Sequence, residues 1–176
     1  LSYELAVKSN DAYNLWEKLF KLGHSYGVQP YGTEALHILR AEKGFIVVGD
    51  ETDGTVTPQD LGMNWIVSKK KGDFLGKKAM SLPFLNGKNR KQLVGIETLD
   101  ERVVLPDGCH AVEDGRPIGH ITSTYFSPTL SRSIALGLIE GGHSRLGSTI
   151  EFSVSKNESV FGKLVDPVFY DNEGKR

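Results

Sequence analysis

The sequence predicts an α+β protein in which a mixed first half is followed by a small antiparallel β-barrel. Apolar residues recur at helical spacing between residues 15 and 22, which is typical of an amphipathic helix. From residue 92 onward, short apolar runs alternate with turn residues at intervals of about 8–15 residues, which is typical of a small antiparallel barrel or sandwich. The change of character near residues 88–91 predicts two domains, at 1–88 and 89–176.

The first half carries signals for one strand and three helices. Tyr3, Leu5 and Val7 alternate with other residues, which predicts a strand over residues 2–8 with one apolar face. We expect the first helix to pack on this strand. The other expected elements are a helix from Asn10 or Asp11 to Gly23, a helix from Thr33 that ends before Gly44, a strand or extended run over 45–48 and a short helix over 76–85.

The second half reads as strands joined by tight turns. Asp114 and Gly115 separate two strand patterns, and this pair accommodates the positive φ angles that a short hairpin turn requires. The expected strands cover residues 93–97, 118–125, 133–139, 149–154 and 159–165.

Composition narrows the functional class. The chain has 176 residues and a formal net charge of -1, which is not the strongly basic balance of a dedicated nucleic-acid binder. No apolar run approaches the roughly 20 residues of a membrane span. The single cysteine, Cys109, allows no internal disulfide, which favours a reducing, cytoplasmic compartment. Because a strand at the first residue needs neighbours to cover it, we also expect the chain to be part of a longer protein.

Two charged residues stand out as candidates for a binding site. Glu4 lies opposite the apolar face of the first expected strand. It is either a surface carboxylate or, if that face lines a cavity, an acceptor for two N–H donors of a flat heterocycle. Arg40 lies near the end of the second expected helix and is separated from Glu42 by one residue. It either belongs to a structural ion network that complements the helix dipole or contacts a ligand.

Other patterns give weaker signals. The sequence has no phosphate-binding Walker loop and no dinucleotide fingerprint. The five histidines do not have metal-ligand spacing, and Cys109 has no obvious activating partner. Lysines at 69–71 together with Lys77 and Lys78 form either a solvated face or a surface that attracts an anionic ligand tail. We therefore predict no metal site and assign no catalytic residue.

Several separated motifs, taken together, resemble the folate-binding aminomethyltransferase family, which includes the T-protein of the glycine cleavage system. The resemblance covers nearly the whole chain. The motifs are LRAEKGF at 39–45, Thr57-Pro58, KGDFLGK at 71–77, Asp114-Gly115, Ile118-Gly119, ITS at 121–123, SPT at 127–129 and Asp166-Pro167. This resemblance implies that residues 1–88 are the C-terminal part of a folate-binding domain and that residues 89–176 are the family's C-terminal β-barrel.

Within this family, the sequence of residues 32–45, 52–62 and 65–76 most resembles the branch formed by the alpha subunits of heterotetrameric sarcosine oxidases. This implies tetrahydrofolate as the ligand of this region. It also implies a complex with beta, gamma and delta subunits, in which FAD, FMN and NAD bind outside this chain. Such a complex oxidises sarcosine to glycine with formation of hydrogen peroxide, and we expect the isolated chain to lack this activity.

The resemblance assigns roles to a few residues. It implies that Glu4 anchors the pterin ring, that Tyr3 lies beside it, and that Arg40 also belongs to the folate site. Leu36 stands where glycine-cleavage relatives often carry a second arginine, which speaks against glycine-cleavage activity. Asp73 stands where the folate-dependent iron–sulfur maintenance proteins carry a cysteine, which argues against that branch. The family's catalytic aspartate lies upstream of residue 1.

Two alternatives remain from the sequence. The first is a dimethylglycine or sarcosine dehydrogenase, which uses a similar folate module but passes electrons to a carrier. The second is a non-catalytic binding or assembly module of the same fold. The electron acceptor, the subunit composition and the folate affinity distinguish these alternatives.

Overall fold

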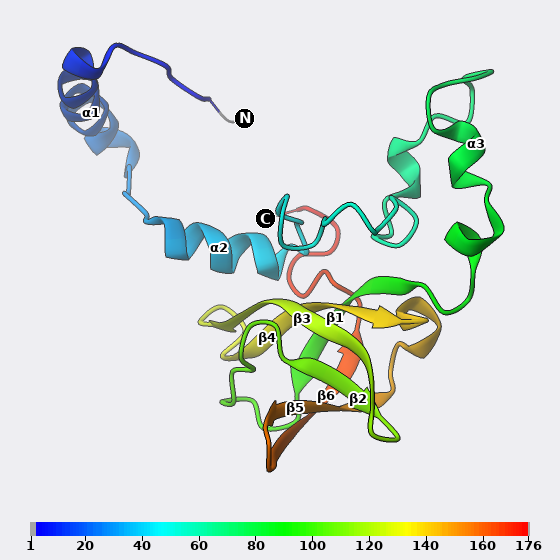
Figure 1. Ribbon diagram of the computed structural model, residues 1–176. Coiled ribbons are helices and arrows are strands. Elements are labelled where there is room, and N and C mark those ends of the chain that lie inside the picture. The colour runs from blue at the N-terminus through cyan, green and yellow to red at the C-terminus, as the bar shows by residue number, and fades with distance from the viewer. Residues whose placement is uncertain (1–2, 176) are drawn as a thin grey trace. The chain divides into compact units, whose positions relative to one another are not determined.

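The computed structural model describes residues 3–175 (Figure 1). By its internal contacts the chain falls into two compact units, one up to Thr33 and one from Glu34 onward. None of the helices in the described residues combines the length and the apolar character needed to cross a membrane. The domain boundary expected near residues 88–91 remains a prediction.

The first unit is built around helix α1, Ser9–Gly23, which continues into a 3-10 turn at His24–Tyr26. The helix is amphipathic as predicted, and the Trp16 and Phe20 rings on it lie 4.6 Å apart. The N-cap is Lys8 rather than Asn10 or Asp11, and its side chain makes no capping hydrogen bond.

The strand predicted over residues 2–8 is wrong for its described part, because residues 3–8 have no regular secondary structure. Tyr3, Leu5 and Val7 are all exposed, and no residue of α1 is buried. A strand needs a neighbour to take its backbone hydrogen bonds, and none of the described residues pairs with this segment. The alternation of side chains alone therefore did not produce a strand, and α1 has no strand to pack on.

In the second unit, helix α2 spans Thr33–Glu42, as predicted. The strand or extended run expected over 45–48 contains no strand and keeps only one isolated bridge, from Val48 to Thr52. The helix expected over 76–85 divides into α3, Lys77–Met80, and a 3-10 turn at Pro83–Asn86. Proline lacks the N–H that would continue a helical ladder, which accounts for this break.

The remainder of the chain forms a closed six-stranded antiparallel barrel in the order β1-β4-β3-β2-β5-β6. Pairing of β1 with β6 closes the ring, so the barrel leaves no free sheet edge. The predicted α+β class with a small barrel is confirmed. The strands are β1 Lys91–Thr98, β2 His110–Glu113, β3 Arg116–Ser127, β4 Arg132–Glu140, β5 Thr149–Ser155 and β6 Glu158–Val165.

The hairpin between β2 and β3 follows the sequence signal closely. Asp114 and Gly115 have φ angles of 50° and 73°, and the flanking residues Glu113 and Arg116 pair across the turn. Two consecutive positive φ angles match a type I′ turn, whose twist suits antiparallel strands.

Two apolar clusters stabilise the second unit. The barrel interior is filled by Val94, Ile96, Leu105, Cys109, Ala111, Ile118, Ile121, Ala135, Ile139, Ile150, Phe152 and Leu164. A second cluster joins Leu61 to Leu93, Leu136 and Leu138 of β1 and β4, with Phe169 packed against it. This second cluster attaches the loop before the barrel to the outer face of the barrel.

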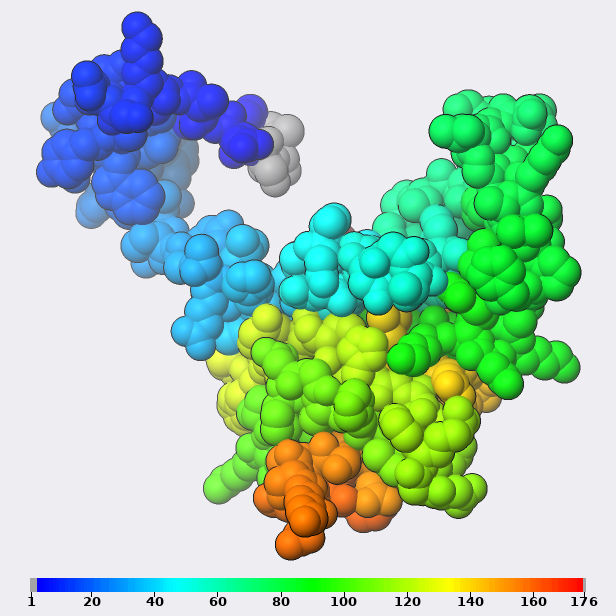
Figure 2. Space-filling view, viewed as in Figure 1, coloured from blue at the N-terminus to red at the C-terminus, as the bar shows by residue number. Residues whose placement is uncertain are grey.

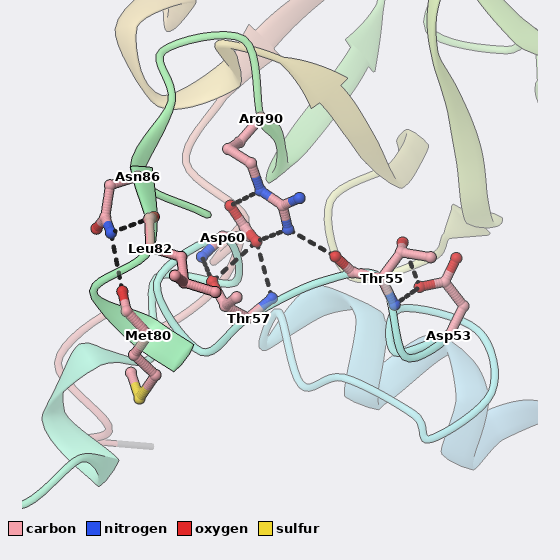
Figure 3. Close-up of polar contacts among 8 residues, drawn as sticks. All are labelled: Asp53, Thr55, Thr57, Asp60, Met80, Leu82, Asn86 and Arg90. Atoms are coloured by element: carbon pink, nitrogen blue, oxygen red, sulfur yellow. Dashed lines mark hydrogen bonds and ion pairs between the residues drawn. The ribbon is translucent and has the colours of Figure 1, made fainter. Parts of the chain in front are cut away.

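A buried polar clamp strengthens the same attachment (Figure 3). The Asp60 carboxylate accepts hydrogen bonds from the backbone N–H and hydroxyl of Thr57 and from the guanidinium of Arg90. Arg90 also donates to the Thr55 carbonyl oxygen. Burial alone would raise the pKa of Asp60, but the hydrogen bonds from Arg90 and Thr57 outweigh it and hold this pKa below its ordinary value.

Candidate functional site

The last turn of α2 is seated on the barrel. Figure 2 shows the cyan segment that follows α2 lying directly on yellow-green strands of the barrel. Glu42 is 2% exposed, and its carboxylate accepts a hydrogen bond of 2.6 Å from the Ser127 hydroxyl on β3. Its backbone oxygen accepts hydrogen bonds from the amides of Phe169 and Tyr170. The helix end is thus held by both the barrel and the C-terminal segment.

Glu51 is the centre of a second buried contact between this region and β3. Its side chain is fully buried. One carboxylate oxygen accepts from the hydroxyls of Thr122 and Ser123 at 2.8 and 2.7 Å. The other accepts from the Val47 backbone N–H at 2.8 Å and from Arg40 at 3.0 Å. A polar group without hydrogen bonds is costly to bury, and the four donors offset this cost for Glu51.

Arg40 is almost entirely committed to this network. Its Nη1 donates to Glu51 and to the carbonyl oxygen of Phe45. Its Nη2 donates to the Ser123 hydroxyl and lies 3.5 Å from the Asp50 carboxylate. Its Nε is buried and has no hydrogen-bond partner within the described part of the chain. One donor of this guanidinium therefore remains for a further acceptor.

An aromatic stack borders the network. The guanidinium carbon of Arg40 lies 5.9 Å from the centre of the Tyr125 ring, within the range of a cation–π contact. The ring of His37, one helical turn earlier on α2, stacks on Tyr125 with centroids 6.4 Å apart. These contacts place an aromatic face beside the Arg40 guanidinium, in addition to its hydrogen-bond partners.

The three predicted site residues lie in different surroundings. Tyr3 and Glu4 belong to the extended segment of the first unit; both are exposed, and Tyr3 is 80% exposed. Arg40 belongs to the second unit and is 7% exposed. The structural ion network considered for Arg40 is present, but its carboxylates are Asp50 and Glu51, while Glu42 bonds to Ser127 instead.

Sequence reasoning missed Glu51, Thr122 and Ser123. Glu51 lies in a run rich in Asp, Thr and Gly that predicts only a turn. The two hydroxyl residues belong to a strand more than 70 positions away in sequence. Within one sequence nothing links these positions, so their convergence needs the fold.

Cys109, for which the sequence offers no obvious activating partner, lies in the barrel core. Its side chain is buried in the barrel. Burial, with a further contribution from Asp107, raises the pKa of this thiol to about 11. Because the thiolate is the nucleophilic form, the group stays in its less reactive protonated form at neutral pH.

Two family models match the chain, one on each side of the start of the barrel. The GCVT N-terminal domain matches residues 1–71, and the glycine cleavage T-protein C-terminal barrel domain matches residues 91–171. The second match covers all six strands of the closed barrel described above, from Lys91 to Val165.

Curated relatives cover the whole chain but extend well beyond it. The sarcosine oxidase subunit alpha of Corynebacterium sp. (strain P-1) is 44% identical over 100% of this chain and 19% of its own length. The same subunit from Rhizobium meliloti (strain 1021) is 36% identical over 100% of this chain and 18% of its own length. The aminomethyltransferase of Clostridium botulinum (strain Okra / Type B1) is 37% identical over 98% of this chain and 46% of its own length.

The fold is also found in a solved structure. The crystal structure of glycine cleavage system aminomethyltransferase T from Bartonella henselae matches with a TM-score of 0.79 and 25% identity. The match covers 93% of this chain and 45% of that one. The chain thus spans just under half of the aminomethyltransferases and about a fifth of the sarcosine oxidase subunits it matches. The two domain models, the relatives that match along the whole chain and this solved structure agree. The chain therefore belongs to the glycine cleavage T-protein family of aminomethyltransferase-like proteins.

Proposed function

We propose that this chain supplies part of a tetrahydrofolate-binding site used in one-carbon transfer. The observation that carries the proposal is that this chain is similar, along its whole length or nearly so, to two kinds of protein with different names: sarcosine oxidase alpha subunits and aminomethyltransferases. A function common to both kinds belongs to the part that they share. Binding of a folate that accepts a one-carbon unit is such a function.

The residues of the first unit suit a pterin ring. The Glu4 carboxylate is exposed, and no described residue forms a hydrogen bond or ion pair with it. Its two oxygens are therefore available to accept an exocyclic amine and a ring N–H side by side, an arrangement that is both strong and geometrically selective. The exposed Tyr3 offers an aromatic face and a hydroxyl next to it.

Arg40 has a different part in the proposal. Glu51, Ser123 and the Phe45 carbonyl oxygen take its terminal nitrogens, and Nε, which has no partner among the described residues, is buried. Its main contribution is to hold the end of α2 on the barrel. A direct contact between Arg40 and a folate stays a prediction.

We further propose that the parent protein is the alpha subunit of a sarcosine oxidase with beta, gamma and delta partners. In such a complex, sarcosine, oxygen and tetrahydrofolate yield glycine, hydrogen peroxide and 5,10-methylenetetrahydrofolate. The redox cofactors FAD, FMN and NAD then lie outside this chain, and the chain alone has no oxidase activity. The similarity to three sarcosine oxidase alpha subunits at 36–44% identity supports this choice.

Because this chain supplies only part of the site, calorimetric titration with tetrahydrofolate tests the proposal on the complete parent subunit, as the wild type and as Glu4→Ala. Loss of a charge-assisted, paired contact costs about 2–4 kcal/mol, which weakens binding roughly thirty-fold or more. Glu17→Ala is the matched control, because Glu17 is another exposed carboxylate of the first unit and should leave the affinity unchanged. Equal binding by wild type and Glu4→Ala contradicts the assignment of Glu4. Failure of the wild type to bind contradicts the folate function of this chain.

A further inference from the structure

Three buried hydroxyl oxygens near one end of the barrel have no hydrogen-bond partner within the described residues. They belong to Thr98 on β1, Thr124 on β3 and Ser133 on β4. Thr98 and Ser133 are each only 1% exposed, so bulk water does not reach them. Nearly all buried polar groups in folded proteins are hydrogen-bonded, and a buried hydroxyl left unpaired costs free energy. Their lack of partners therefore needs a physical explanation.

The strand register places the three hydroxyls together on the inner face of the barrel. Ala135 of β4 pairs with Ile96 on one side and with Thr124 on the other, and residues that oppose one another directly in a ladder share a face. Ile96 and Ala135 belong to the interior apolar cluster, so Thr124 also points inward. Thr98 and Ser133 lie two residues from Ile96 and Ala135 along their strands, which puts them on the same inner face. Because β4 lies between β1 and β3, the three hydroxyls are neighbours.

The expected spacing of these groups matches a bridging water molecule. Thr98 and Ser133 continue the register of the pair Glu97 and Ile134, so they oppose one another across the ladder. Opposed side chains have Cβ atoms about 4.5–5.5 Å apart. Two hydrogen bonds of about 2.8 Å each, made through one water, span a similar distance. Water also donates and accepts, as the hydroxyls themselves do.

The chemistry of the three groups argues against a charged ligand. All three are neutral, and a charge buried without a partner of opposite sign is very costly. The charged residues next to them in sequence, Arg132 and Glu97, form an ion pair with each other. Both alternate with the inward-facing residues, so they lie on the outer face of the barrel. A small neutral molecule that donates and accepts hydrogen bonds is the ligand that remains.

We propose that Thr98, Thr124 and Ser133 bind a structural water molecule inside the barrel. This water links β1, β4 and β3 at the point where β1 ends. Thr124 directly follows Ser123, whose hydroxyl bonds to Glu51 on the outer face. The water and that buried network therefore hold the same part of β3 from its two faces. The proposal does not depend on folate binding, so either can fail without the other.

A high-resolution crystal structure tests the proposal directly, and this chain is sufficient for it because all strands of the closed barrel lie within it. We expect an ordered water within about 3.2 Å of at least two of the three hydroxyl oxygens. Hydroxyls that bond to one another or to the backbone, with no water between them, would overturn the proposal. A different ligand at this position would also overturn it.

Single substitutions distinguish a bound water from a dry interior. Thr98→Val and Thr124→Val keep a similar side-chain shape but remove one hydroxyl each. If the water is bound, it loses a partner, and we expect the equilibrium constant for unfolding in urea to rise about fivefold. If the interior is dry, each variant removes an unsatisfied polar group, so stability should stay the same or increase.

The matched control is Thr149→Val, because Thr149 is an exposed threonine at the start of β5. This variant should change the same equilibrium constant by no more than about twofold. Losses of stability in Thr98→Val and Thr124→Val that are no larger than the control's, or gains of stability, would contradict a bound water. If a variant fails to fold, the crystal structure of the wild type still decides the question.

Discussion

Glu51 holds together the buried network between the α2 region and the barrel, and its removal is the most informative stability test. Glu51→Ala takes away the fully buried carboxylate that faces Arg40 at 3.0 Å. It also removes the acceptor of the Val47 amide and the Ser123 hydroxyl, while the Thr122 hydroxyl keeps the Leu136 carbonyl oxygen as its second acceptor. Breaking a buried ion pair by removing one partner costs about 3–5 kcal/mol, because the remaining charge stays buried and unpaired.

Urea unfolding followed by far-ultraviolet circular dichroism measures this cost. Asp50→Ala is the matched control, since Asp50 faces the same guanidinium at 3.5 Å but its side chain is 45% exposed. An exposed pair contributes at most about 1 kcal/mol, so the two variants should differ clearly. If Glu51→Ala costs no more than Asp50→Ala, the network does not anchor the α2 region.

A double variant tests the coupling inside the network. Arg40→Met/Glu51→Leu replaces both charges by apolar groups of similar size and leaves no unpaired buried charge. Its cost should be well below the sum of the costs of Arg40→Met and Glu51→Leu, as for other buried pairs. Simple additivity would contradict the assignment of these two residues as mutual partners.

Three further predictions concern the barrel and its attachments. Hydrogen bonds lower the pKa of Asp60 below its ordinary value of 3.8. Its ionised form therefore stabilises the fold above that pH, and this contribution is lost as the pH falls through the lowered pKa. Urea unfolding at a series of acidic pH values should show this loss of stability, and Arg90→Met should make the loss smaller. Gly44→Ala should lower the free energy of unfolding by at least about 2 kcal/mol, because Gly44 has φ +64° and an added Cβ would lie 2.5 Å from a backbone oxygen. The control is Gly62→Ala, which has φ +72° but open space around the added Cβ and so carries only the backbone strain. Equal losses of stability in the two variants would refute the steric argument. Cys109, with its pKa raised to about 11, should react with iodoacetamide at pH 8 far more slowly than the denatured chain does, and rapid alkylation of the folded protein would contradict its burial.

Local signals predicted most of the regular structure. The pair Asp114-Gly115 determines its own hairpin, since the required φ angles depend on these two residues alone. The apolar spacing of α1 and the strand patterns of the barrel likewise depend on short stretches of sequence. The motifs shared with the aminomethyltransferase family also identified the family, which the domain matches confirm.

The failures concern features that depend on distant residues. Alternation in Tyr3, Leu5 and Val7 satisfied the pattern of a strand, but a strand also needs a pairing partner, and the described chain provides none. Glu51 was read as part of a loop because its burial depends on Ser123, which lies 72 positions away. The sequence therefore predicted the candidate site only as separate residues. The hydrogen-bond network around Arg40 could be recognised only once the fold had brought its members together.

Hydrogen exchange with and without tetrahydrofolate tests the proposed function most directly, because it locates the ligand on the chain. Residues 3–8 have no regular secondary structure and are exposed, so their amides should exchange rapidly in the free protein. We predict that saturating tetrahydrofolate slows exchange in this segment around Tyr3 and Glu4. Binding that leaves this segment unprotected, or the absence of binding, would contradict the account.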